Sequence, residues 1–143
     1  MARRTARCAC GRVTIDVQGE PEIVVVCHCE FCQRRSGNVS IAAAHFAATQ
    51  VEVRGETTRF NGLETDGVGA VGVEGGINYR FCTTCGSTLY WDFVHPVTSE
   101  PRVAIAVGNF ADPTFPAPTA EVFPEQRAHW ATPIPGAEQW EGA

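Results

Sequence analysis

The chain has 143 residues, 44% of them hydrophobic, and a formal net charge of -5 at pH 7. A chain of this length is expected to fold as one domain, residues 1–143, and its negative charge argues against general nucleic-acid binding. The first twenty residues contain no apolar run, and no later segment has the roughly 20 apolar residues needed to cross a bilayer. We therefore expect a cytoplasmic protein that is made without a secretory signal and does not bind membranes.

Short apolar segments, separated by 14 glycines and 9 prolines, predict a mainly β fold with few or no helices. Residues 13–17 alternate apolar and polar side chains, as a strand with one buried face does. Four further strands are predicted from short apolar runs, at residues 23–26, 41–44, 51–53 and 103–107. At most one short helical turn is expected, over residues 31–36 and ended by Gly37.

Two stretches in the second half of the chain are interpreted as loops. Residues 67–76 contain a G-x-G-x-x-G-like spacing, which binds phosphate where it joins a strand to a helix. That context is missing, so we expect a flexible loop or a hairpin. Residues 113–118 contain three prolines and predict an extended connection. We expect Phe123, Trp130 and Trp140, which follow it, to fold back over the core.

All seven cysteines lie in three short clusters: Cys8 and Cys10; Cys27, Cys29 and Cys32; Cys82 and Cys85. In a reducing compartment clustered cysteines are more often metal ligands than disulfides, and an odd number cannot all be paired. Thiolates separated by one or two residues can bind a single ion. Seven sulfurs divide most simply into a closed set of four and an open set of three.

Glycines indicate which cysteines form the set of four. Cys10 is followed by Gly11 and Cys85 by Gly86, and glycine can adopt the positive φ that turns backbone N–H groups toward the sulfurs. We therefore predict a structural zinc ion bound by the cysteine quartet, which comprises Cys8, Cys10, Cys82 and Cys85. The alternatives are four buried or redox cysteines without metal, and an iron–sulfur cluster.

The remaining three cysteines, Cys27, Cys29 and Cys32, are called the cysteine trio below. Three sulfurs within six residues can bind a second zinc ion from one side and leave its fourth position open, as in catalytic zinc sites. The alternative is a closed Cys₃His site completed by one of the four histidines: His28, His45, His95 or His129. His28 itself is expected to point away from the sulfurs.

Two arginines follow the cysteine trio directly. Arg34 and Arg35 could bind the carboxylates of an acidic ligand, because a guanidinium group pairs with a carboxylate through two parallel hydrogen bonds. Adjacent arginines are equally common on solvated surfaces. The sequence leaves both interpretations open.

Four segments resemble the glutathione-dependent formaldehyde-activating enzyme family, which includes centromere protein V: residues 8–13, 27–37, 80–91 and 107–113, with Trp130 downstream. The resemblance implies a mainly β, zinc-stapled, Mss-four-like fold, with a structural zinc ion on the quartet and a catalytic one on the trio. It also implies a carbon–sulfur lyase that interconverts S-hydroxymethylglutathione with glutathione and formaldehyde. The partners would then be a small-molecule thiol, with glutathione as co-substrate, and an aldehyde.

The sequence departs from the family pattern at three positions: Ala6 replaces a glycine, Glu30 a small hydroxyl residue and Gln33 an arginine. None of these residues is a cysteine, so the predicted metal sites are unaffected, but the charge and shape beside the trio change. Two other functions would use the same frame, a non-enzymatic zinc module that binds a protein partner and a redox sensor that releases zinc on oxidation. Tyr90, Trp91 and Asn109 lie in the segments that resemble the family, and the two aromatic residues are expected in the core rather than in a substrate pocket.

Overall fold

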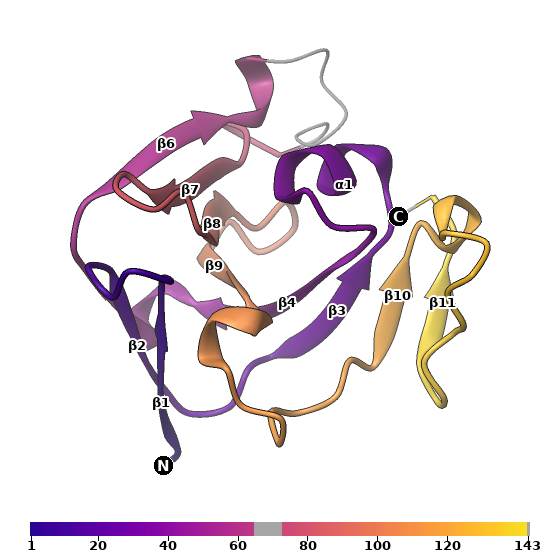
Figure 1. Ribbon diagram of the computed structural model, residues 1–143, viewed down its shortest axis with the longest axis horizontal. Coiled ribbons are helices and arrows are strands. Elements are labelled where there is room, and N and C mark those ends of the chain that lie inside the picture. Colours follow the sequence, from indigo (N-terminus) through magenta and orange to yellow (C-terminus); the bar gives the residue numbers. More distant parts are fainter. Residues whose placement is uncertain (65–72, 143) are drawn as a thin grey trace.

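In the residues that the structure describes, 1–64 and 73–142, two β-sheets make up most of the fold (Figure 1). The structure is a computed structural model. The smaller sheet has three strands in the order β1–β2–β5, and both pairs are antiparallel. Its strands are β1 (Arg3–Arg7), β2 (Thr14–Gln18) and β5 (Val51–Arg54).

The larger sheet has eight strands in the described part of the chain, in the order β11–β10–β3–β4–β9–β8–β7–β6. Strand β10 runs parallel to both of its neighbours, and the other pairs are antiparallel. The strands are β3 (Ile23–Cys27), β4 (Ile41–Ala47), β6 (Thr57–Asn61), β7 (Asn78–Cys82), β8 (Thr88–Val94), β9 (Pro101–Ala106), β10 (Ala120–Val122) and β11 (Glu138–Trp140).

The two faces of the larger sheet carry two hydrophobic clusters. Ala43 and Ala44 are adjacent in β4 and therefore point to opposite faces. The cluster around Ala44 includes buried residues of both sheets, among them Ala6, Ile15, Val17, Phe46, Leu89 and Ile105. The cluster around Ala43 consists of Ile41, Tyr79, Trp91, Ala104 and Ala106, and the half-buried Cys27 and Cys32 pack against it. The second cluster therefore supports the region of the cysteine trio.

Helix α1 (Glu30–Ser36) connects β3 to β4. Cys29 is its N-cap, and its Sγ accepts a hydrogen bond from the backbone N–H of Cys32 at 3.3 Å. The helix ends at Gly37, whose φ of 74° is readily adopted only without a side chain. Four short 3₁₀ helices are also present among the described residues: η1 (Ala48–Gln50), η2 (Gly62–Glu64), η3 (Val107–Phe110) and η4 (Pro124–Gln126). None of the helices described is long and apolar enough to span a membrane.

The mainly β fold predicted from the sequence is confirmed, and all five predicted strands are present as β2, β3, β4, β5 and β9. The helical turn predicted over residues 31–36 is confirmed as α1. Most of the predicted glycine-rich loop lies outside the described residues, and at its end Gly76 donates a backbone hydrogen bond to Val73 in a turn.

The prediction that the aromatic residues of the tail cover the core is wrong for the two tryptophans, whereas Phe123 is half-buried. Trp130 is 66% exposed and Trp140 is 38% exposed. The tail instead returns to the edge of the larger sheet, where β10 pairs with β3 and β11 pairs with β10. Backbone hydrogen bonding to that edge, rather than burial of the aromatic rings, fixes the tail next to the cysteine trio (Figure 1).

Candidate metal centres

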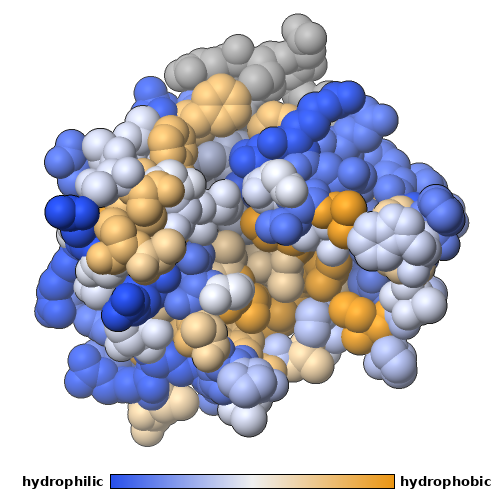
Figure 2. All heavy atoms as spheres, viewed as in Figure 1, coloured by the Kyte–Doolittle hydropathy of each residue, from blue (hydrophilic) through white to orange (hydrophobic). Residues whose placement is uncertain are grey.

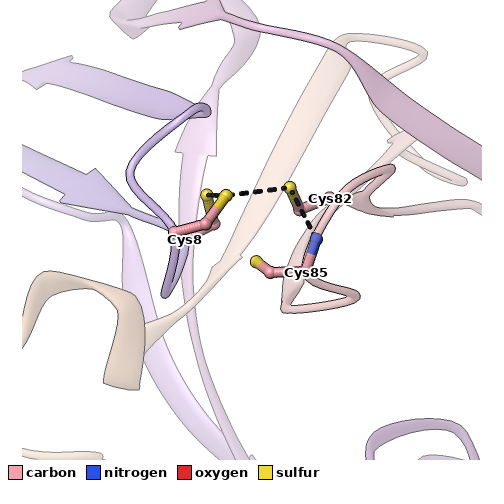
Figure 3. A group of neighbouring side chains, drawn as sticks. Cys8, Cys82 and Cys85 are labelled. Atoms are coloured by element: carbon pink, nitrogen blue, oxygen red, sulfur yellow. Dashed lines mark hydrogen bonds between the residues drawn. The ribbon is translucent and has the colours of Figure 1, made fainter.

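The cysteine quartet brings together two turns that are far apart in the sequence. Figure 3 shows the sulfurs of Cys8, Cys82 and Cys85 directed toward a common centre between the turn after β1 and the turn after β7. All four quartet sulfurs lie within 4.8 Å of one another. The sulfur of Cys10 is 3.6 Å from that of Cys8 and 3.7 Å from that of Cys82. Tetrahedral zinc with bonds of about 2.3 Å requires sulfurs about 3.8 Å apart, so the quartet fits a zinc ion.

The two glycines that marked the quartet in the sequence have the backbone conformation predicted for them. Gly11 has a φ of 79° and Gly86 a φ of 74°. The backbone N–H groups of Val13 and Cys85 donate hydrogen bonds to the sulfurs of Cys8 and Cys82, at 3.3 and 3.4 Å. These donors stabilise negative charge on the sulfurs, as a thiolate–metal site requires.

A serine further supports the quartet. The Ser87 hydroxyl lies 3.1 Å from the sulfur of Cys85 and accepts a hydrogen bond from the backbone N–H of Ala9 at 3.0 Å. The hydrogen bond with Ser87 is the main cause that lowers the pKa of Cys85 to about 5. Cys85 is therefore poised to be a thiolate at neutral pH.

The cysteine trio lies where β3 ends and α1 begins. Cys27 is the last residue of β3, Cys29 caps α1, and Cys32 lies in the first turn of the helix. The three sulfurs lie within 4.8 Å of one another. No histidine or carboxylate ligand atom of the described residues joins them in this set. The trio can hold a metal ion from one side.

The protonation pattern of the trio also fits a cation. Hydrogen bonds from Cys27 and Cys32 lower the pKa of Cys29 to about 2, and the bond that Cys27 donates to Cys29 raises the pKa of Cys27. The hydrogen bond with Cys27 lowers the pKa of Cys32. The hydrogen bond with Cys29 and the burial of Cys32 have the opposite, larger effect, and the pKa of Cys32 is raised to about 11. One thiolate is therefore shared between two thiols, and a divalent cation would allow all three to deprotonate.

The four histidines considered as a fourth ligand lie elsewhere. His28 is buried and hydrogen-bonded to Glu121, as expected for a side chain that points away from the sulfurs. His45 contacts the ring of Phe93 edge-on, and burial lowers its pKa to about 4. The Nδ1 of His95 accepts backbone hydrogen bonds within its own turn, and His129 is exposed. The positions of the four histidines therefore do not support a Cys₃His site at the trio.

Glu121 on β10 is a buried carboxylate that the sequence analysis missed. It is 1% exposed, and its Oε1 accepts a hydrogen bond from His28 Nε2 at 2.7 Å. Its Oε2 accepts hydrogen bonds from Ile134 N–H at 2.9 Å and Gln139 Nε2 at 2.7 Å, and Arg127 lies at 3.4 Å. Burial opposes the charge, but these donors together lower the pKa of Glu121 to about 2.

The same tail also holds the start of α1. The side-chain oxygen of Gln126 accepts a hydrogen bond from the backbone N–H of Glu30 at 2.7 Å. The side chain of Gln33 donates to the carbonyl oxygens of His28 at 2.8 Å and Gln126 at 3.4 Å. Residues about 93 positions away in the sequence thereby fix the turn that carries the trio.

Replacing Glu121 by glutamine is expected to lower the free energy of unfolding by about 2 kcal/mol. The NH₂ group of the glutamine would then face N–H donors in a buried site, where it could not accept their hydrogen bonds. The folded-state pKa of this carboxyl lies below its unfolded value, so its stabilisation is present at neutral pH and declines as the pH falls below about 4.5 toward 2. Urea unfolding of the zinc-loaded protein at several pH values tests this. Glu138→Gln, at an exposed position of β11, should change the free energy by less than about 0.5 kcal/mol.

The two arginines after the trio have different environments. The Arg34 side chain is 81% exposed and lies 3.6 Å from Glu30 on the solvent side of α1. Arg35 points to the sheet, where its guanidinium carbon lies 4.2 Å from the ring centre of Tyr79 and 4.5 Å from that of Trp91. Its charge partly offsets the effects of the Cys29 hydrogen bond and of burial, which raise the pKa of Cys32. Arg35 is thus the arginine nearer to the trio's chemistry.

A groove of about 520 Å³ lies beside α1 and is called the aromatic groove below. Its lining residues are Phe31, Arg34, Arg35, Phe60, Tyr79, Arg80, Phe81, Gly86 and Thr88. The Tyr79 ring contacts those of Phe31 and Phe60, with ring centres 5.4 and 6.4 Å apart. Burial raises the pKa of Tyr79, and the charges of the trio raise it further. Phe31, Cys27 and Cys32 all pack against the hydrophobic cluster that contains Tyr79, so the groove adjoins the trio.

A second cavity, of about 430 Å³, lies between the end of α1, β4 and η3. Figure 2 shows the molecule from the same side as Figure 1, with a hollow near the centre of this face and hydrophobic residues visible inside it. Asn109 lines this cavity, but its side-chain amide donates to the carbonyl oxygens of Thr88 and Leu89, at 2.7 and 3.3 Å. Asn109 therefore ties η3 to β8, as a structural residue does.

A family model described as "glutathione-dependent formaldehyde-activating enzyme" matches residues 3–126 of the 143. This range contains every residue of the quartet and the trio. No curated protein matches the chain.

Proposed function

Because the chain belongs to the glutathione-dependent formaldehyde-activating enzyme family, we propose that it is a zinc-dependent carbon–sulfur lyase that interconverts S-hydroxymethylglutathione with glutathione and formaldehyde, or acts on a related thiol–aldehyde adduct. The observation that carries the proposal is the open cysteine trio, in which three sulfurs lie within 4.8 Å of one another without a fourth ligand from the described residues. Zinc sites with three protein ligands and an open position are typically catalytic. The catalytic zinc ion is assigned to the trio and the structural one to the quartet.

A zinc ion on the trio would supply a Lewis acid that holds the glutathione sulfur as a thiolate at neutral pH. The sulfur forms a bond to the formaldehyde carbon, the carbonyl π electrons move to oxygen, and the proton lost by the thiol ends on that oxygen. The reverse sequence cleaves the carbon–sulfur bond. The role of the trio would be to hold the zinc ion on a turn whose position is fixed by β3, α1 and the tail.

Arg34 and Arg35 are proposed to bind the carboxylates of an acidic ligand. Both line the aromatic groove, and Arg35 is held over two aromatic rings, so little of its side-chain freedom remains to be lost when a ligand binds. Arg34 is more exposed, and its contribution would be weaker because solvent screens its charge.

The direct test is the rate of S-hydroxymethylglutathione formation. Thiols add to formaldehyde without a catalyst, so the rate must be measured with and without zinc-loaded protein at equal thiol concentration. The proposal requires that the rate rises in proportion to the protein concentration. Equal rates in the two reactions would remove the lyase assignment.

A further inference from the structure

The lining of the aromatic groove does not match a substrate made only of glutathione and formaldehyde. Phe31, Phe60 and Phe81 contribute apolar surface to a space of about 520 Å³. Formaldehyde is one carbon in size, and glutathione is a polar tripeptide whose carboxylates, ammonium and amide groups lose hydration when they lie against phenylalanine rings. Aromatic linings instead favour ligands with apolar, ring-containing parts.

The charges around the groove restrict the ligand further. Arg34 lies 3.6 Å from the carboxylate of Glu30, and the Nε of Arg80 lies 3.1 Å from that of Asp92. Arg35 differs, because its Nε and Nη2 atoms are buried and have no hydrogen-bond partner among the described residues. Buried N–H donors without an acceptor are costly. The guanidinium group of Arg35 therefore offers hydrogen-bond donors to an anion.

We infer that the physiological aldehyde is larger than formaldehyde and carries both an aromatic ring and a carboxylate. The ring would lie in the aromatic groove against Phe31, Phe60 and Phe81, and the carboxylate would pair with Arg35. This inference rests on the proposed function, because it places the aldehyde carbon beside a sulfur held at the trio. The step stays balanced, since the S–C bond forms, the carbonyl π pair moves to oxygen, and the thiol proton ends there to give a hemithioacetal.

Four aldehydes separate the two features, each tested with glutathione and zinc-loaded protein. Formaldehyde has neither feature, benzaldehyde has the ring, glyoxylate has the carboxylate and 4-carboxybenzaldehyde has both. The ratio of the catalysed to the uncatalysed rate of addition should be highest for 4-carboxybenzaldehyde, with roughly tenfold for each feature. A ratio for formaldehyde equal to or above that for 4-carboxybenzaldehyde would overturn the inference and leave the lyase assignment standing. No catalysis with any aldehyde would instead refute the proposed function.

Binding of 4-methylbenzoate, measured by calorimetry, tests the groove without a thiol or an aldehyde. Arg35→Ala should weaken this binding roughly tenfold, and Phe60→Leu, which removes a ring at nearly constant volume, should weaken it severalfold. Arg54→Ala, on the smaller sheet, should leave it unchanged. If Arg35→Ala does not fold, Phe60→Leu alone decides. Absence of 4-methylbenzoate binding by the wild-type protein, or equal affinities for wild type and Phe60→Leu, would contradict the inference.

Discussion

A Cys85→Ser variant is expected to lose one zinc ion and to lose its cooperative fold. The quartet joins two turns whose cysteines, such as Cys10 and Cys82, are 72 residues apart in sequence. Closing so long a loop removes about 4 kcal/mol of unfolded-state freedom by the loop-entropy relation. Zinc binding to four thiolates contributes about 10 to 16 kcal/mol in zinc-finger peptides, comparable to the whole stability of a domain, about 5 to 15 kcal/mol.

Zinc analysis of the purified variant, together with circular dichroism during urea unfolding, measures this outcome. A matched control is Thr84→Ser, an exposed position in the same turn, which should keep both the metal content and the unfolding midpoint of the wild type. A folded Cys85→Ser protein with unchanged zinc content would show that the quartet is not the structural site.

A Cys29→Ser variant is expected to behave in the opposite way, with an intact fold and no catalysis. The variant retains the quartet, and a serine at this position remains a favourable N-cap, so α1 should still form. With one of the three sulfurs removed, the trio's zinc ion is lost and the rate of glutathione addition to aldehydes should fall to the uncatalysed value. Zinc content should fall from two ions per chain to one.

The rate assay and the unfolding curve have to be measured on the same preparation, because a fall in rate matters only if the protein remains folded. Glu30→Gln is a suitable control, since the Glu30 side chain is 72% exposed on the same helix, and the variant should keep most of the rate. A Cys29→Ser protein that retains the full catalysed rate would show that the trio is not needed for catalysis.

The metal sites were the part of the structure most accessible from the sequence. Cysteine spacing and the glycines after Cys10 and Cys85 suffice to separate the quartet from the trio, because each reflects a local geometric requirement. The different environments of Arg34 and Arg35 could also have been predicted from the sequence. In a helix, Arg35 shares a face with Phe31 and Arg34 with Glu30, four residues earlier. That periodicity assigns Arg35 to the sheet and Arg34 to solvent.

Several strands could not be predicted because they do not carry an apolar pattern. In β1, only Ala6 is buried and three of the five residues are arginines. Strand β6, at the edge of the larger sheet, is mostly polar, and its pairing with β7 is fixed by the hydrogen-bonding partner rather than by its own composition. The interaction of His28 with Glu121 connects positions 93 residues apart. Only the tertiary fold brings them together.

Trp130 and Trp140 are exposed, although the sequence analysis predicted that they cover the core. Large aromatic residues predict burial on average, but the tail is held by parallel pairing of β10 with β3 and by the buried Glu121. A strand of only three residues, with a buried carboxylate at its centre, is too short to give a hydrophobic signal. The same carboxylate supports His28, so the tail helps to position the trio although it contains none of its ligands.

The central claim is that two zinc ions share seven cysteine sulfurs, so that one of them has an open position. Zinc K-edge absorption spectroscopy of the wild-type protein measures this directly. The expected result is two zinc ions per chain with seven sulfur ligands between them, and eight after addition of glutathione, because the thiol fills the open position. A single zinc ion per chain, or a nitrogen ligand at the second zinc that glutathione does not displace, would contradict the claim.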